Sequence, residues 1–192
     1  MDGHSLGGDA ARAKDALRGR CREARARRDD PAGDPARTTR LLALLDGCST
    51  VACYASTAGE PDTWATIDAL EGRGVRVLLP VLRREPDWAW HAGPGALRPA
   101  AGGILEPTTD ALGPAALGAA DAIVLPGLAG TPSGDRLGAG GGWYDRALAW
   151  AAPSALTVLL LDDAEVCDQL PTQEWDRPVR AIVTQSRTLI VA

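Results

Sequence analysis

Short apolar runs limit what this chain can fold into more than any other feature. Each run is only four to seven residues long and is apolar almost throughout, instead of alternating with polar residues. This pattern is typical of parallel strands that are buried on both faces, with helices in the crossover connections. The sequence therefore predicts the α/β class: a single-domain, three-layer α/β/α fold with a mostly parallel central sheet. The runs are residues 50–54, 75–81, 122–125, 156–161 and 179–184.

Helical segments separate most of these runs, and their boundaries follow from turn and capping residues. A long helix is predicted over residues 9–28, where alanine, arginine and leucine dominate. Further helices are predicted over 36–45, from a cap at Asp62 or Thr63 to residue 71, over 146–152 and over 163–170. Residues 88–91 are expected to form an edge or antiparallel strand, and the Gly- and Pro-rich stretch 92–117 a long loop.

The length of 192 residues suits one domain with a core large enough to need no disulfide or metal. Residues 1–9 are polar and glycine-rich and are predicted to be disordered, so the domain is placed at 10–192. Formal charge is unevenly distributed. Residues 1–40 carry ten basic and seven acidic side chains, whereas the rest of the chain is acidic, giving −5 in total. A nucleic-acid binder more often has a dominant basic face, so that class of partner is disfavoured.

The four cysteines are not spaced as metal ligands or as a disulfide framework, and reduced thiols are the favoured interpretation. No apolar run reaches membrane-spanning length, and residues 1–9 contain no signal-peptide core. We therefore expect a cytoplasmic protein that is a monomer, with small molecules as its partners and neither nucleic acid nor membrane among them.

A glycine-rich stretch at residues 136–145 is the strongest candidate for a functional site. Glycines lack Cβ, so a ligand oxygen can come within hydrogen-bond distance of their main chain. Arg136 precedes the glycines and offers a planar fork of donors suited to phosphate. Asp145 follows them and offers a carboxylate suited to Mg²⁺. The stretch lies between the apolar run 122–125 and a helical segment, which is the context of a phosphate-binding loop.

The first long helix carries a second candidate. Lys14, Arg18, Arg22 and Arg25 are spaced three or four residues apart and so share one helical face. Such a face is usually only solvated. However, Lys14 is the one lysine in a chain with nineteen arginines, which suggests a position where a compact point charge is needed.

Several short motifs, in this order and at this spacing, resemble the 5-formyltetrahydrofolate cyclo-ligase family, also called 5,10-methenyltetrahydrofolate synthetases. The resemblance covers nearly all of residues 14–184. It implies an ATP- and Mg²⁺-dependent enzyme that cyclises 5-formyltetrahydrofolate to 5,10-methenyltetrahydrofolate, through a phosphorylated formyl intermediate, with release of ADP and phosphate. The motifs are Lys14-Asp15-Ala16-Leu17-Arg18, Gly59-Glu60-Pro61-Asp62-Thr63, Gly103-Ile104-Leu105-Glu106-Pro107, Leu125-Pro126-Gly127-Leu128-Ala129, residues 136–145, Leu170-Pro171 and Asp176.

The resemblance also implies roles for single residues. Arg136, Glu60 and Tyr144 are implied as catalytic, and Asp145 and Asp176 as ligands of Mg²⁺. The substrate-binding set is Glu60, Ala139, Gly140, Gly141, Gly142 and Trp143. The ATP-binding set is Lys14, Asp15, Ala16, Leu17, Arg18, Arg136, Leu137, Gly138, Ala139, Gly140, Gly141, Gly142, Trp143 and Tyr144.

The chain departs from the family pattern in its aromatic residues. Gly102 stands where an aromatic commonly helps to hold the folate, Trp143 replaces the first tyrosine of a Tyr-Tyr-Asp, and the chain contains no phenylalanine. Trp88 or Trp90 could supply the lost stacking area. The alternative is a nucleotide-binding protein of the same fold that has lost or changed its folate pocket. A sugar-phosphate or coenzyme-A enzyme on a similar scaffold is a further alternative, since fold alone does not fix function.

Overall fold

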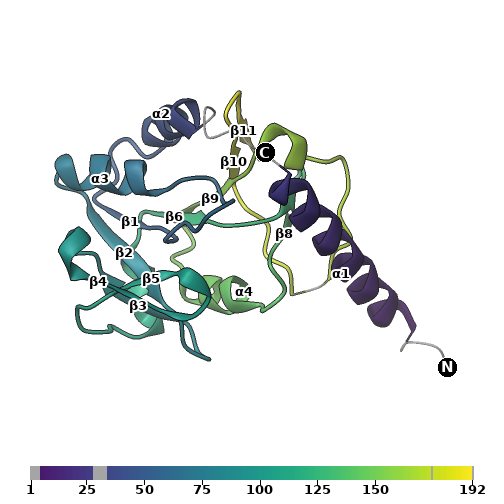
Figure 1. Cartoon of the computed structure of the whole chain (residues 1–192), viewed down its shortest axis with the longest axis horizontal. Helices are drawn as coiled ribbons and strands as arrows, with labels where there is room; N and C mark the ends of the chain where they lie inside the picture. The colour runs from purple at the N-terminus through teal and green to yellow at the C-terminus, as the bar shows by residue number, and fades with distance from the viewer. Residues whose placement is uncertain (1–4, 28–33, 174, 192) are drawn as a thin grey trace.

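The computed structural model describes residues 5–27, 34–173 and 175–191. A seven-stranded sheet forms its centre, with the strand order β11-β10-β9-β6-β1-β2-β3 (Figure 1). The five inner strands run parallel to one another, and only the two edge strands are antiparallel to their neighbours. The strands are β1 Thr50–Ala52, β2 Arg76–Val81, β3 Asp87–Trp90, β6 Ala122–Leu125, β9 Leu156–Leu160, β10 Ala181–Val183 and β11 Thr188–Ile190.

This sheet confirms the predicted α/β class, and each predicted strand is present. The stretch at 88–91 is indeed an antiparallel edge strand. Strand β11 was missed by the sequence reading. Thr184 lies at the β10–β11 connection, where its backbone N–H and hydroxyl donate to the carbonyl of Arg187. The last strand is short and only partly buried, so it lacks the continuous apolar run that identifies the inner strands.

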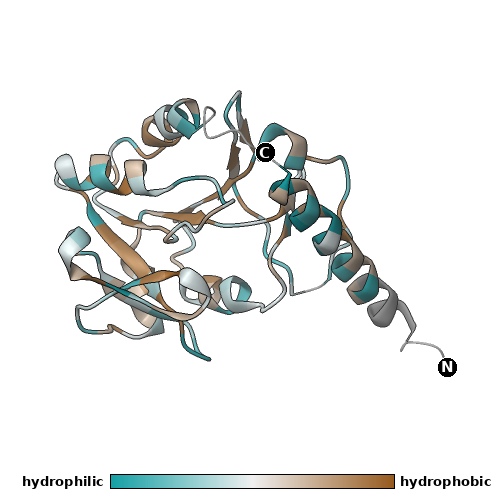
Figure 2. Cartoon of the chain, in the orientation of Figure 1, coloured by the Kyte–Doolittle hydropathy of each residue, from teal (hydrophilic) through white to brown (hydrophobic). Residues whose placement is uncertain are grey.

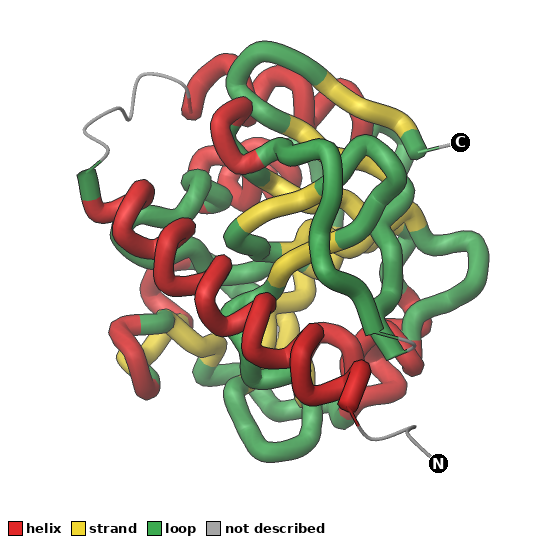
Figure 3. The backbone as a smooth tube through the Cα atoms, turned by 90° about the vertical axis from the view of Figure 1, so that its right-hand side faces the viewer, coloured by secondary structure: helices red, strands yellow, loops and turns green. Residues whose placement is uncertain are grey.

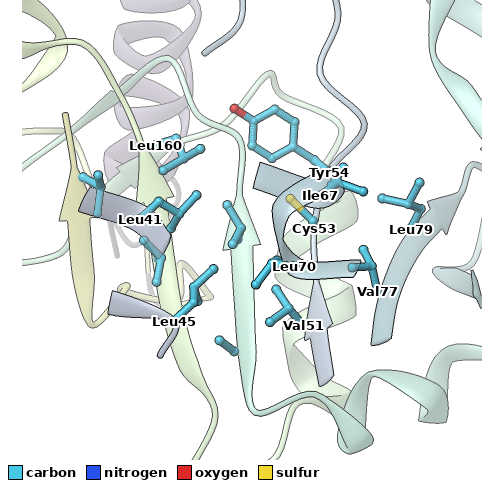
Figure 4. Close-up of a cluster of buried hydrophobic side chains, with 14 of the residues drawn as sticks. Leu41, Leu45, Val51, Cys53, Tyr54, Ile67, Leu70, Val77, Leu79 and Leu160 are labelled. Atoms are coloured by element: carbon cyan, nitrogen blue, oxygen red, sulfur yellow. The ribbon is translucent and has the colours of Figure 1, made fainter. Parts of the chain in front are cut away.

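Helices α2 (Asp34–Leu44) and α3 (Trp64–Gly72) cover one face of the sheet. Their buried residues Leu41, Ile67 and Leu70 pack against the β-strand residues that point to that face, such as Val51 and Leu160 (Figure 4). Helix α3 begins where the sequence predicts. Thr63 occupies the N-cap position, and the side chain of Asp62 before it accepts hydrogen bonds from the backbone N–H groups of Trp64 and Ala65.

A second apolar cluster covers the opposite face, which completes the three layers. It joins Leu117, Ala147 and Leu148 to strand residues such as Ile123 and Leu159. The helical turns on this face are α4 (Trp143–Ala147) and the 3₁₀ turns η4 (Pro114–Ala119) and η5 (Leu148–Trp150). The helix predicted at 146–152 therefore starts three residues earlier and changes to 3₁₀ geometry, which is common at helix ends.

Helix α1 (Ser5–Ala26) lies apart from these layers, at the end of the molecule beyond β8 (Figures 1 and 3). It begins inside the 1–9 segment that was predicted to be disordered, because each residue added to an existing helix gains one hydrogen bond. Met1–His4 of that segment lie outside the described residues. Figure 2 shows α1 to be largely hydrophilic, in contrast to the hydrophobic inner strands. Within the described ranges, no helix is long and apolar enough to cross a membrane.

The stretch at 92–117 is more ordered than the predicted long loop. Strands β4 (Leu97–Pro99) and β5 (Leu105–Pro107) form an antiparallel pair; η2 (Pro94–Ala96) precedes it, and η3 (Ala101–Gly103) connects the two strands. Glu106 in β5 is buried, and its Oε1 accepts a hydrogen bond from the backbone of Leu82 at 2.6 Å. This contact ties the hairpin to the sheet, and a loop reading based on glycine and proline content could not foresee it.

The helix predicted at 163–170 is also shorter than expected. Only η6 (Asp163–Glu165) is helical. A capping box between Asp162 and Glu165 caps its N-terminus. The chain then leaves the helical path because Val166 bridges to Gly130, and the backbone N–H of Cys167 donates to the carbonyl of Gly130 at 2.9 Å. A tertiary backbone contact therefore overrides the local helical tendency.

Candidate active site

A cavity of about 590 Å³ opens between α1 and the carboxyl ends of three neighbouring parallel strands. Glu60 follows β1, Leu82 directly follows β2, and Pro126 directly follows β6, and all three line the cavity. Parallel α/β sheets bind ligands at this edge, outside the carboxyl ends of the strands. The position of the cavity therefore follows from the topology of the sheet.

The glycine-rich loop forms one wall of this cavity, as residues 138–142 all line it. The loop does not leave the strand at 122–125 directly, as the sequence suggested. The short antiparallel pair β7 (Ala129–Gly130) and β8 (Arg136–Leu137) intervenes, because the backbone of 128–137 closes into a hairpin. Gly140 adopts φ +115°, and a Cβ there would lie 3.4 Å from Nε of Arg18. The positive φ therefore favours glycine at this position.

Arg136 and Asp145, at the two ends of the loop, meet inside the cavity. Nη2 of Arg136 donates to Oδ1 of Asp145 at 2.5 Å. The Arg136 side chain is 4% exposed, and its Nε has no partner among the described residues. A buried guanidinium with unused donor capacity is suited to an additional anionic ligand.

Helix α1 brings its basic face to the same loop, although more than a hundred residues separate the two in sequence. Nε of Arg18 donates to the carbonyl of Gly138 at 2.9 Å, and Nη2 of Arg22 donates to the carbonyl of Ala139 at 2.8 Å. Lys14 is buried, and it lines the cavity together with Arg18. The basic face of α1 thus contacts the glycine loop through Arg18 and Arg22, whereas Lys14 lines the same cavity without a hydrogen bond to the loop.

Lys14 is held by the turn that carries the second predicted carboxylate. Its Nζ lies 2.5 Å from Oδ2 of Asp176 and 3.2 Å from Oε1 of Gln173. The same carboxylate oxygen accepts the backbone N–H of Gln173 at 2.7 Å. The cavity thus contains three cation–carboxylate pairs, Lys14 with Asp176, Arg136 with Asp145 and Arg18 with Asp15.

Further along α1, Arg25 fixes the helix to the body of the protein. It pairs with both carboxylate oxygens of Glu165, at 2.5 and 2.9 Å, and also donates to the carbonyl of Gly127 at 2.5 Å. Both side chains are about nine-tenths buried. Burial and this pairing oppose one another, and the pKa of Arg25 is raised, so the guanidinium stays charged.

The predicted aromatic residues of the site are packed against one another. Trp143 lies edge-on to Trp88 and to Tyr144, with ring centroids 5.4 and 4.9 Å apart. Burial raises the pKa of Tyr144, so its phenol remains protonated at neutral pH. Neither Trp88 nor Trp90 lines the cavity. The idea that they replace the missing aromatic at Gly102 is therefore wrong: Trp88 is in the core, and Trp90 is covered by Arg76 at 4.4 Å.

Glu60 also lies at the cavity, held by a local turn. Its Oε2 accepts hydrogen bonds from the backbone N–H and the hydroxyl of Thr57, at 2.8 and 2.9 Å. This arrangement fixes the side chain and leaves the other carboxylate oxygen available to a ligand.

Most of the residues predicted for the site line the cavity, with two exceptions on α1. Ala16 is exposed and does not line it, and Leu17 packs on a small apolar cluster outside it. Sequence reasoning did not select several lining residues. Some belong to the motifs quoted above, and others follow strands or adjoin Asp176. They are Ala11, Leu82, Ile104, Pro126, Gly127, Leu128, Gln173 and Trp175.

Two carboxylates of the cavity are candidate ligands for a metal ion. Across the described parts of the chain, no group of three or more His, Cys, Asp or Glu side chains could hold an ion. However, Mg²⁺ usually binds through one or two carboxylates together with substrate phosphates and water, and not in a cage made only of protein. Asp145 and Asp176 line the same cavity and fit that mode of binding.

Fold and site together describe an α/β protein whose ligand cavity carries basic side chains, a glycine-rich loop and carboxylates. A family model described as the 5-formyltetrahydrofolate cyclo-ligase family matches residues 10–185. The chain belongs to the 5-formyltetrahydrofolate cyclo-ligase family, and it is an enzyme of that ligase class.

Similar proteins agree with this assignment. The 5-formyltetrahydrofolate cyclo-ligase of Mycolicibacterium smegmatis is 36% identical over 148 residues, which cover 73% of this chain and 76% of that protein. The Escherichia coli 5-formyltetrahydrofolate cyclo-ligase is 35% identical over 145 residues, covering 72% and 79%. The NMR structure of Aquifex aeolicus 5,10-methenyltetrahydrofolate synthetase matches with a TM-score of 0.77 and 26% identity, over 93% of this chain and 92% of that one.

Proposed function

We propose that this enzyme uses ATP and Mg²⁺ to convert 5-formyltetrahydrofolate into 5,10-methenyltetrahydrofolate, with release of ADP and phosphate. Family membership implies the use of ATP. The observation that carries the proposal for this chain is the meeting of Lys14, Arg18 and Arg136 with the glycine-rich loop at one cavity. Three cations and the backbone N–H groups of a loop are the contacts that a triphosphate needs.

Lys14, Arg18 and Arg136 hold the phosphates in this proposal, together with the backbone of residues 138–142. Residues Asp15, Leu137 and Ala139 complete the nucleotide side of the cavity. Each of the three cations now contacts a carboxylate or a carbonyl of the protein. An incoming polyanion competes for these donors, and electrostatic attraction favours the exchange because phosphate carries more charge than either partner.

Asp145 and Asp176 would hold Mg²⁺ at the phosphates, with water and phosphate oxygens completing its coordination. When bound, Mg²⁺ neutralises charge on the phosphate oxygens. The two carboxylates are released for this task when Arg136 and Lys14 turn towards the nucleotide.

The reaction needs positioning more than a strong base. The formyl oxygen attacks the γ-phosphorus, the bond to the β-phosphate oxygen breaks, and ADP leaves. The N10 amine then attacks the activated formyl carbon, the ring closes, N10 loses its proton, and phosphate departs. Arg136 faces the transferring group and opposes the charge that spreads over it in the transition state. Glu60, Trp143 and Tyr144 contact the folate, with residues 139–142 between the two substrates.

The reaction itself is the direct test. Purified protein with ATP, Mg²⁺ and 5-formyltetrahydrofolate should produce the absorbance of methenyltetrahydrofolate together with an equal amount of phosphate. Phosphate release from ATP without formation of the methenyl product would contradict the proposal and favour a changed folate pocket.

Comparing the KM for ATP with the KM for folate tests the proposed nucleotide side of the cavity. Lys14→Ala and Arg18→Ala should raise the apparent KM for ATP far more than the KM for folate, because both side chains face phosphate in the proposal. Equal losses on both substrates would instead indicate that these residues only hold α1 in place.

A further inference from the structure

Trp175 combines two properties that conflict in a folded protein. Its side chain lines the cavity, yet the residue is 65% exposed. An indole presents about 150–250 Å² of mostly apolar surface, so leaving it in water forgoes a large burial energy. Trp88, by contrast, is 1% exposed in the core. The exposure of Trp175 is therefore costly unless a ligand covers the ring.

The turn that carries Trp175 is fixed on both sides. Oδ2 of Asp176 accepts the N–H of Gln173 at 2.7 Å, and the N–H of Asp176 donates to the carbonyl of Gln173 at 3.0 Å. Lys14 of α1 binds both of these side chains. Hydrogen bonds of Gln173 and Asp176 therefore connect the neighbourhood of the ring to α1.

The other aromatic rings of the cavity are already engaged. Trp143 contacts Trp88 and Tyr144, and Tyr144 packs in addition against both core clusters. Trp175 has no ring neighbour within the described parts of the chain. Its faces are free to stack on a flat aromatic ligand.

We propose that Trp175 stacks on the purine base of ATP and so determines nucleotide affinity. This inference rests on the proposed use of ATP at this cavity. The chemistry of a flat ring also fits folate, but the neighbours of Trp175 favour the nucleotide. Asp176 next to it binds Lys14, a proposed phosphate contact, whereas the proposed folate contact Glu60 comes from the β1 side of the sheet.

Direct binding measurements on the whole protein separate the base from the phosphates. Trp175→Ala should raise the Kd for ATP about 5- to 150-fold, the range that corresponds to base-on-aromatic stacking of about 1–3 kcal/mol. The Kd for inorganic tripolyphosphate, which has no base, should stay the same. Trp175→Phe should retain most of the ATP affinity but lose the quenching of indole fluorescence that stacking of ATP on Trp175 should cause. Trp150→Ala is the matched control, since Trp150 is 50% exposed but does not line the cavity.

Several results would overturn the inference. Equal weakening of ATP and tripolyphosphate would mean that the substitution acts through Lys14 and Asp176. A higher KM for folate with unchanged ATP binding would assign the ring to folate. Failure of the proposed function is a distinct result: ATP binding that depends on Trp175, without formation of methenyltetrahydrofolate, would retain the stack and reject the reaction.

Discussion

Helices α2 and α1 both pack against the body of the molecule, but by different kinds of contact. Helix α2 contributes Leu41, fully buried, to an apolar cluster that spans the sheet and α3. Helix α1 adds Leu17 and Cys21, both only partly buried, to a cluster with just three buried members. Most of its remaining contacts run from cationic side chains to carbonyls and carboxylates.

Because of this difference, the contacts of α2 contribute mainly to stability, whereas some contacts of α1 involve side chains of the proposed ligand site. Apolar burial is non-directional and holds α2 whether or not a ligand is present. The bonds of α1 are directional and charge-assisted, and several of their donors are the groups proposed to bind phosphate. Part of the attachment of α1 is therefore available to a ligand. We expect substitutions in the two regions to affect different measurements.

The largest effect is expected in the region of α2. Leu41→Ala should lower the free energy of unfolding by about 2–5 kcal/mol, because it removes a fully buried side chain and leaves a cavity. Chemical denaturation measures this change. Leu17→Ala on α1 is the matched control and should cost clearly less, because Leu17 is only partly buried. Equal losses would show that α1 belongs to the same cooperative core.

Next in size is a change in rate in a protein that stays folded. Arg136→Ala should raise the barrier by about 2.7–4 kcal/mol, a hundred- to a thousandfold in kcat, as expected when a preorganised charge contact is lost. Asp145→Asn should also collapse kcat, since it removes a proposed Mg²⁺ ligand. Arg136→Lys keeps the charge but not the fork and should recover only part of the rate. A folded Arg136→Ala enzyme with near wild-type turnover would exclude this loop as the site of chemistry.

Substitution of Arg25 tests how α1 is attached to the body of the protein. Arg25→Gln removes the guanidinium from its buried pair with Glu165 and should lower the free energy of unfolding by about 1–3 kcal/mol. Faster proteolysis within α1 and a higher KM for ATP, with little change in kcat, are the expected signs. The double change Arg25→Met with Glu165→Leu should restore much of the loss, because an apolar pair can replace a buried ion pair. No recovery would mean that the charges themselves are needed.

The smallest effect is expected at the exposed end of the same face. Arg22→Ala removes one hydrogen bond to the carbonyl of Ala139 and should raise the KM for ATP about two- to tenfold, corresponding to about 0.5–1.5 kcal/mol. Arg27→Ala is the control on the same helix. Arg27 lies 3.8 Å from Glu23, and both side chains are exposed, so its loss should leave KM unchanged. Equal shifts in the two variants would point to the overall charge of α1.

Sequence patterns predicted the parts of the protein that local rules control. The inner strands were recognisable because parallel strands are apolar on both faces, and α3 because Asp62 marks its start. The glycine loop and its Arg136 and Asp145 ends were recognisable because a run of glycines between an arginine and an aspartate is typical of phosphate-binding loops. Edge strand β11 and the pair β4–β5 were missed, since they lack a continuous apolar run.

Tertiary structure decided which of these residues meet. The sequence indicated that Lys14 and Arg18 share a helical face, but only the packing of α1 brings that face to the glycine loop. It also left open whether Asp176 pairs with Lys14, and it gave no sign that Trp175 lines the cavity. The reason is physical: strands and turns depend on neighbours within a few residues, whereas contacts over more than a hundred residues depend on how the whole chain packs.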